Sequence, residues 1–167
     1  MENLKKGQTM ATQIPAEAFT KALYMLLDET FDQVQGFYLD KGTSMFETLA
    51  TISAAEASIP VGGKCATLAA QVKHTTFYLD VLEHSVRTQQ FEPVDWGQIW
   101  RETAAVSAEE WNGLKQALRE SYDRIKALIH DTTEWPSERE IGGAIAMIVH
   151  TAYHLGEIRQ ALCLVKQ

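Results

Sequence analysis

The stretch SAEEWNGLKQALRESYDRIKALI, residues 107–129, decides the fold class of this 167-residue chain. Ser107, followed three residues later by Glu110, fits a capping box, in which the two side chains satisfy backbone N–H groups that the first helical turn leaves unpaired. Apolar residues then recur at helical spacing, and they are Trp111, Leu114, Leu118, Tyr122, Ile125 and Ile129. The pattern predicts a long amphipathic helix that buries this stripe in a core.

Three further segments show the same helical spacing of apolar residues. One is expected to begin near Pro15, which suits a first helical turn, and to end at Gly36. A second covers about residues 65–87, and a third, over about residues 137–164, begins with another capping box. Alternating β-branched runs of the kind that form strands are very few. The sequence therefore predicts an all-α protein.

Two long connections separate these helical segments. The first follows Gly36 and is expected to include a short helix around residues 44–52, and the second, residues 88–106, is expected to hold a helical turn or two. Four amphipathic helices most simply form a four-helix bundle, and long connections permit crossovers. We predict an all-α four-helix bundle with long crossover connections, as a single domain over residues 1–167 in which residues 1–14 form a flexible N-terminal segment.

Composition and charge exclude several classes of partner. The net charge of −7 argues against a nucleic-acid partner, because affinity for phosphates rests on clustered Lys and Arg. The absence of an 18-residue apolar run and of a secretory signal predicts no membrane partner and a cytoplasmic location. Cys65 and Cys163 lack metal-ligand or redox spacing and are expected to act as small apolar residues, although a disulfide between them stays open.

Two histidines lie four residues apart in HTAYHLGEIRQAL, residues 150–162. Residues at this spacing share one face of a helix with Cβ atoms about 5 to 6 Å apart, so His150 and His154 can bind one ion together. Met147 and Glu157 share that face. Taken alone, such a pair is more often satisfied by hydrogen bonds than by a metal.

A third histidine lies in the helix predicted over residues 65–87. His74 shares a mostly apolar face with Gln71 and Tyr78, so its imidazole is expected to point inward. If the two helices are neighbours, His74, His150 and His154 form a three-histidine set. Neutral imidazole suits zinc, nickel, copper or ferrous iron, and three protein ligands leave a coordination position open, as catalytic sites do.

Other metal and nucleotide chemistries find no support in the sequence. His84 and His130 lie near helix ends and are not predicted to be ligands. Residue 151 is Thr, so the glutamate of the metalloprotease motif HExxH is missing. The paired Glu-x-x-His ligands of di-iron bundles, phosphate-binding loops and nucleophile elbows are also missing.

Three stretches carry a family resemblance: GGAIAMIVHTAYHLGEIRQAL, residues 142–162, ATLAAQVKHTTFYLDVL, residues 66–82, and SMFETLATISAAEASIP, residues 44–60. They resemble the final helix, the second helix and the segment between helices 1 and 2 of the DinB-like (DinB/YfiT) superfamily, so the resemblance covers most of the chain from about Phe19 onward. In that family's final helix an HxxYHxGxIRQ pattern provides two metal-binding histidines. The resemblance implies a four-helix bundle that holds a divalent metal ion (Zn, Ni or Fe) through three histidines.

These ligands carry over to this chain as His74, His150 and His154. Gln71 departs from the pattern, because relatives often carry a histidine there; His74 is taken as the third ligand because it follows the apolar row. Gln71 and Met147 are expected to line the pocket of the site. Glu157 and Tyr78 are the nearest candidates for a general base.

The resemblance also implies a class of reaction. Characterised members include metal-dependent enzymes that transfer or open substrates with a low-molecular-weight thiol such as bacillithiol or mycothiol, and none of this implies DNA polymerase activity. We therefore expect a metal-dependent thiol S-transferase or hydrolase, in which the metal acts as a Lewis acid. The alternatives are a non-catalytic ligand-binding or stress-associated protein with a structural metal or none, and a plain helical dimerisation module.

A homodimer is expected in each of these cases. Trp96, Trp100 and Trp111 offer more aromatic surface than one small bundle need bury, and a two-fold dimer is the commonest closed assembly of soluble proteins.

Overall fold

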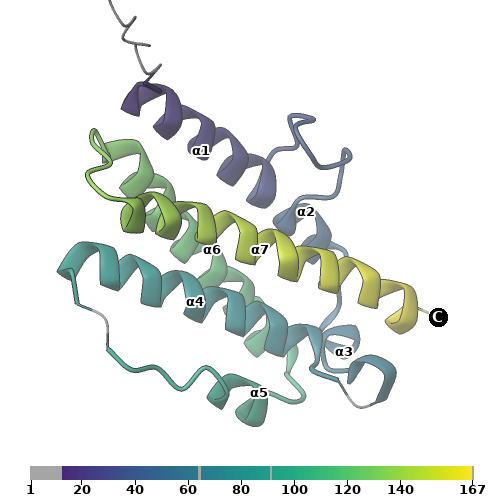
Figure 1. Ribbon diagram of the computed structural model, residues 1–167. Coiled ribbons are helices and arrows are strands. Elements are labelled where there is room, and N and C mark those ends of the chain that lie inside the picture. Colours follow the sequence, from purple (N-terminus) through teal and green to yellow (C-terminus); the bar gives the residue numbers. More distant parts are fainter. Residues whose placement is uncertain (1–12, 64, 91, 167) are drawn as a thin grey trace, which may run out of the picture.

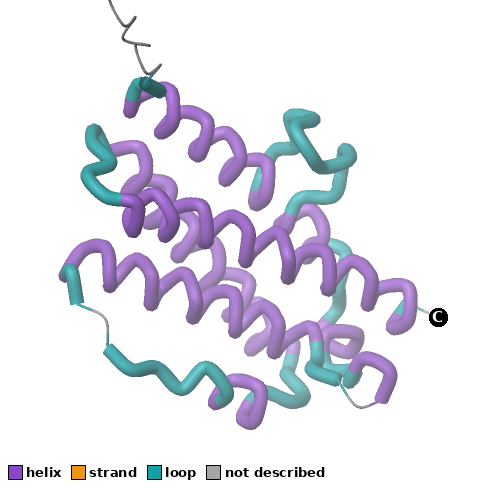
Figure 2. Tube along the Cα trace, viewed as in Figure 1, coloured by secondary structure: helices purple, strands orange, loops and turns teal. Residues whose placement is uncertain are grey.

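The computed structural model describes residues 13–63, 65–90 and 92–166, and within them it shows helices and no strand (Figures 1 and 2). The all-α prediction is confirmed, whereas the predicted flexible segment lies outside the described residues except for residues 13 and 14. The elements are α1 (Ala16–Phe31), α2 (Met45–Ala50), α3 (Ala54–Ala57), the 3-10 turn η1 (Val61–Gly63), α4 (Leu68–Thr88), α5 (Gln98–Glu102), α6 (Ala108–Asp131) and α7 (Glu138–Val165).

The four longest helices pack against one another around one core. Both α4 and α1 contact α6 and α7. Figure 1 shows α7 between α1 and α4, with α6 farther from the viewer. The buried apolar side chains come from all four helices and from α2 and α3. This pairing places α4 beside α7, which is the condition for a site between them; the bundle topology with crossovers stays a prediction.

Local capping fixes where the last two helices begin. The Glu110 backbone N–H donates to Ser107 Oγ at 3.2 Å, and the Glu110 carboxylate accepts from the Ser107 N–H at 2.7 Å. The box of Ser137 and Glu140 repeats this arrangement at the start of α7. Both predicted capping boxes are confirmed, and each satisfies donors that a helix start leaves unpaired.

The first helix ends earlier than its apolar spacing predicts. It stops at Phe31 rather than at Gly36, because the fully buried Glu29 carboxylate draws the following chain around itself. That carboxylate accepts four backbone N–H groups at 2.7 to 3.2 Å, which belong to Gln35, Phe37, Tyr38 and Leu39. Gly36 provides a turn with φ of +84° inside this loop.

Other element boundaries differ in smaller ways. The helix expected over residues 65–87 begins at Leu68, because the Thr67 side chain accepts the N–H of Ala70 and caps it there. The short helix expected over residues 44–52 is α2, and a second short helix that was not predicted, α3, follows it; each has its own capping box. The turn expected within residues 88–106 is α5.

Two expectations about side-chain exposure need correction. Cys65 and Cys163 are free thiols and both are exposed rather than packed as apolar groups. Trp111 is buried, and its indole N–H donates to the Ile52 carbonyl at 2.8 Å, so it offers no surface to a partner. Trp96 and Trp100 are partly exposed, as expected of surface aromatics.

Among the described residues, no helix combines the length and the apolar character needed to cross a membrane.

Candidate metal centre

Three histidine side chains converge between α4 and α7. His74 comes from α4, and His150 and His154 come from successive turns of α7. The Nε2 atom of His150 lies 3.2 Å from Nε2 of His74 and 3.1 Å from Nε2 of His154. One nitrogen from each imidazole falls within 4.8 Å of the others, so the three could hold a metal ion together.

This convergence follows from the spacing of the histidines in the sequence together with the packing of the two helices. Four-residue spacing puts His150 and His154 on one face of α7, and the packing of α7 against α4 brings His74 to them. His84 and His130 are exposed and lie outside the cluster.

Two polar side chains hold the His154 ring. Its Nδ1 lies 2.6 Å from Gln71 Oε1 and 2.8 Å from Glu157 Oε2. Both neighbours are acceptors, so Nδ1 carries the proton and Nε2 presents its lone pair to the cluster. Orientation of a ligating imidazole by a carboxylate is the usual arrangement around protein-bound metals. Gln71 and Glu157 therefore lie where the sequence predicted them, next to the histidines.

Aromatic rings cover the other two histidines. Trp100 of α5 lies against His74 with ring centroids 4.4 Å apart and the rings tilted by 32°, and Tyr78 stacks on His150 at 3.7 Å. Trp96 lies against Tyr78 at 5.7 Å. Trp100 was expected on a dimer surface, and its contact with His74 was not predicted, although two tryptophans in the connection before α6 were the available clue.

The surroundings keep the imidazoles neutral. Burial first, and then the neighbouring His154, lower the pKa of His74 to about 4. Burial and the two other histidines lower the pKa of His150 to about 4. Burial also lowers the pKa of His154, against the opposing effect of the Glu157 carboxylate. Neutral imidazole is the form that binds metals.

The donor set fits a divalent cation better than it fits hydrogen bonding alone. With Nδ1 of His154 protonated, only His150 and His74 can place a proton among the three Nε2 atoms, and His150 Nε2 can donate to one neighbour at most. Nδ1 of His74 is buried without a hydrogen-bond partner among the described residues. Zinc ligated by imidazole at 2.0 to 2.1 Å in a tetrahedral site separates its nitrogens by about 3.3 Å, close to the observed spacings.

A surface recess of about 510 Å³ adjoins the Gln71 and Glu157 side of the cluster. Its lining also includes Tyr153 and Gly156 of α7, together with apolar groups from η1 and the start of α4. Glu157 is the one charged side chain among its lining residues. The recess therefore presents a mostly uncharged surface beside the histidines.

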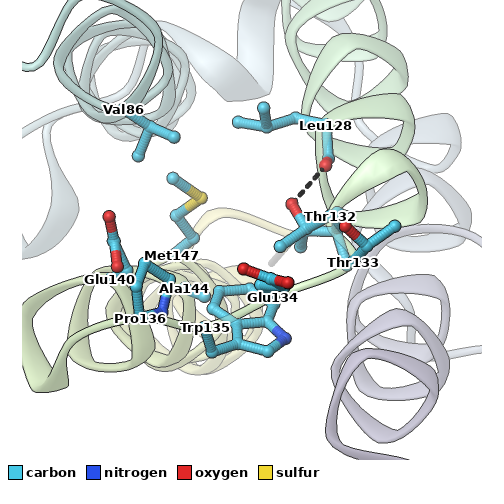
Figure 3. A pocket seen from close by; sticks show the side chains of 11 residues that line it. Val86, Leu128, Thr132, Thr133, Glu134, Trp135, Pro136, Glu140, Ala144 and Met147 are labelled. Carbon is cyan, nitrogen blue, oxygen red and sulfur yellow. Dashed lines mark hydrogen bonds between the residues drawn. The ribbon is translucent and has the colours of Figure 1, made fainter. Parts of the chain in front are cut away.

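Met147, the other predicted pocket residue, lies elsewhere. It is buried and lines a cavity of about 300 Å³ whose lining includes none of the three histidines. Figure 3 shows it there with Val86 of α4, Leu128 of α6 and Trp135 of the connection before α7. The side chain leaves α7 toward the core, one turn before His150, so the structure does not bring it to the candidate metal centre.

Comparison with known proteins identifies no relative for this arrangement. No protein-family model, curated protein or solved structure matches the chain.

Proposed function

We propose that this chain is a DinB-like four-helix-bundle protein that binds one divalent metal ion through His74, His150 and His154. The single observation that carries the proposal is the convergence of three Nε2 atoms, with His150 at 3.1 to 3.2 Å from both others. The resemblance of residues 66–82 and 142–162 to two helices of that superfamily supports the same three ligands. Zinc, nickel and iron all suit this donor set.

The activity we propose is that of a metal-dependent thiol S-transferase or hydrolase. When bound, the ion supplies Lewis acidity, which makes a nucleophile available at neutral pH by lowering the pKa of a thiol or water. A low-molecular-weight thiol is the proposed co-substrate.

The chain's own residues take positioning roles around this centre. Glu157 accepts a hydrogen bond from Nδ1 of His154, so its carboxylate is engaged in orienting a ligand rather than in taking a proton from substrate. Burial raises the pKa of Tyr78, so its hydroxyl keeps its proton at neutral pH and its ring supports His150. Trp100 covers His74 and excludes water from that side.

Metal analysis of protein purified without a His tag tests the site. We expect one metal ion per chain, and its loss in the double variant His150→Ala/His154→Ala. The matched control is His84→Ala, which removes an exposed imidazole from α4 outside the cluster and is expected to leave the metal content unchanged. The proposal would be contradicted by a wild-type protein that takes up no divalent metal, or by a double variant that retains it.

A non-catalytic protein with a structural metal is the second candidate. It is favoured by the burial of His74 and His154, which are 7% and 4% exposed. Cobalt substitution separates the two functions, because the visible spectrum of bound Co²⁺ follows its ligands. A spectrum that changes when a small thiol such as 2-mercaptoethanol is added indicates an open position and supports the enzyme; an unchanged spectrum supports the structural role.

A further inference from the structure

The outward face of α7 is uncharged over most of its length. From residue 142 to residue 164, none of the exposed residues of this helix is Asp, Glu, Lys or Arg. Its most exposed apolar side chains are Ile145, Val149, Tyr153 and Leu164, which are 41%, 60%, 61% and 52% exposed. Together with Gly142, Gly156 and the exposed Gln160 they follow three-and-four spacing, so they form one continuous strip, here called the α7 stripe.

Two glycines in the α7 stripe have no explanation within the chain. A Cβ placed on Gly142 or Gly156 would meet no atom within 4 Å among the described residues beyond its own stretch of helix. Glycine in a helix costs about 1 kcal/mol relative to alanine, so the fold alone favours a larger residue at both positions. Small residues allow another helix to approach closely, and the distance between packed helices depends on the side chains at the contact.

We propose that two copies of this chain pair through the α7 stripe, with the two α7 helices antiparallel and a two-fold axis near Tyr153. A two-fold interface must be self-complementary, because the same patch meets itself in reverse order. Counted from Tyr153, Val149 lies four residues before and Gly156 three after, while Gly142 and Leu164 lie eleven before and eleven after. Val149 and Leu164 of one copy therefore lie opposite Gly156 and Gly142 of the other, while Ile145, eight residues before Tyr153, lies opposite Ala161.

The recess beside Gly156 can receive side chains of the other copy. In the antiparallel pairing, Ile145 and Val149 of one copy lie over the C-terminal half of the partner helix, where the recess of about 510 Å³ opens. This volume has room for two aliphatic side chains. The partner would then cover the Tyr153 and Glu157 side of the histidine cluster.

Charge at the two ends of α7 favours the antiparallel orientation. The first turn of the helix holds Glu138, Arg139 and Glu140, with a net charge of −1, and Lys166, whose Nζ donates to the Thr51 carbonyl at 2.7 Å, is exposed at its end. An antiparallel pair brings each Glu138 toward the partner's terminal lysine, whereas a parallel pair would bring like charges together.

The α7 stripe supplies about half of the area that a dimer of standard size needs. It exposes on the order of 400 Å² of apolar surface, which is the size of the largest apolar patch on many monomeric proteins. A standard interface takes about 800 Å² per partner, and the flanking surfaces of α1 and α4, which lie on either side of α7 in Figure 1, would supply the remainder as a polar rim.

Sedimentation velocity over about a hundredfold range of protein concentration tests the interface. The wild-type chain is expected to sediment as a dimer, and Val149→Glu to raise the dissociation constant at least about a hundredfold, because it buries an unpaired charge in each copy. The control is Ala127→Glu, which adds the same charge to the exposed face of α6. Circular dichroism melting checks that each variant folds; if Val149→Glu does not, Gly156→Leu, which blocks the approach of the partner helix, replaces it.

Cysteine crosslinking tests the orientation in a Cys65→Ser/Cys163→Ser background. The double variant Val149→Cys/Gly156→Cys is expected to form an interchain disulfide, while Val149→Cys alone is not, because antiparallel helices hold residue 149 away from its own copy. A monomeric wild type, a dimer that survives Val149→Glu, or crosslinking through Val149→Cys alone would each overturn the proposal. None of these readouts requires bound metal, so the proposed function is tested separately.

Discussion

Two buried polar clusters in this molecule differ in how their hydrogen-bonding groups are satisfied. The Glu29 carboxylate is fully buried and accepts four backbone N–H groups. In the second cluster, Nε2 of His150 lies 3.1 to 3.2 Å from Nε2 of the two other histidines, and Nδ1 of His74 has no partner among the described residues. The first cluster is complete within the chain, and the second is complementary to a cation.

We expect the Glu29 cluster to serve the stability of the fold and the histidine cluster to serve metal binding. A buried charge that is fully hydrogen-bonded stabilises the loop around it, and removing it leaves its donors unpaired. Imidazole lone pairs that converge contribute little to the free energy of folding by themselves, but they stabilise the fold when a cation binds them. Changes in the Glu29 cluster should therefore affect stability and spare metal binding, and changes in the histidine cluster should do the reverse.

The largest expected effect is the stabilisation of the fold by metal. Zinc at about a thousand times its dissociation constant should raise the free energy of unfolding by about 4 kcal/mol, because it binds the folded state in preference to the unfolded chain. The same addition should leave His154→Ala almost unchanged and should stabilise Glu29→Gln as much as the wild type. Thermal and urea unfolding with and without zinc measure the rise; an equal rise in His154→Ala would contradict the assignment.

The next largest effect is expected from Glu29→Gln in the absence of metal. The amide would turn an N–H group toward backbone N–H donors and leave some of them unpaired, which should lower the free energy of unfolding by about 2 to 3 kcal/mol. Urea unfolding measures this loss. Glu17→Gln changes an exposed carboxylate of the same helix and serves as the control. Equal stability of the two variants would show that the loop does not depend on the Glu29 charge.

Glu157→Gln should weaken metal binding by about tenfold without a comparable change in stability. Loss of the carboxylate that orients a ligating imidazole lowers metal affinity to about this extent. Competition with a chromogenic chelator measures the affinity, and Glu109→Gln on the exposed face of α6 is the control. If both variants bind metal as the wild type does, Glu157 does not position His154.

The smallest effect is a pH dependence of the Glu29 contribution. Burial opposes ionisation of this carboxyl, but its four backbone donors outweigh burial and hold its pKa below the ordinary value of 4.5. The stability that it contributes is therefore complete above about pH 4.5 and decreases as the pH falls through the lowered pKa. The difference in unfolding free energy between the wild type and Glu29→Gln should shrink on acidification. A difference that stays constant to the acid limit of folding would contradict this.

Local patterns predicted the helices because their determinants are local. The capping boxes that begin α6 and α7 each span four residues, and the apolar stripe of α6 needs no partner to be recognised. The end of α1 could not be predicted in this way. It depends on a side chain at Glu29 reaching backbone groups six to ten residues later, and no periodicity reports such a contact.

The three histidines were predicted as one set, but from the residues alone only on the condition that their two helices are neighbours. Helical spacing paired His150 with His154, but only the contact of α4 with α7 joins His74 to them. The number of tryptophans did not reveal their different roles. Trp111 is buried in the core, whereas Trp100 covers an imidazole. The direction of the Met147 side chain also depends on how α7 is rotated about its own axis within the core. Helical spacing does not determine this rotation, so it could not separate Met147 from the positions that face the histidines.

The contact between Trp100 and His74 gives the protein a built-in optical reporter. An indole 4.4 Å from an imidazole ring senses what that ring carries, because protonation or paramagnetic ions on it quench indole fluorescence. Nickel or copper binding should therefore dim the emission of Trp100, and Trp100→Phe should remove that part of the signal. Occupancy of the site can then be followed in solution, in real time and without any attached label.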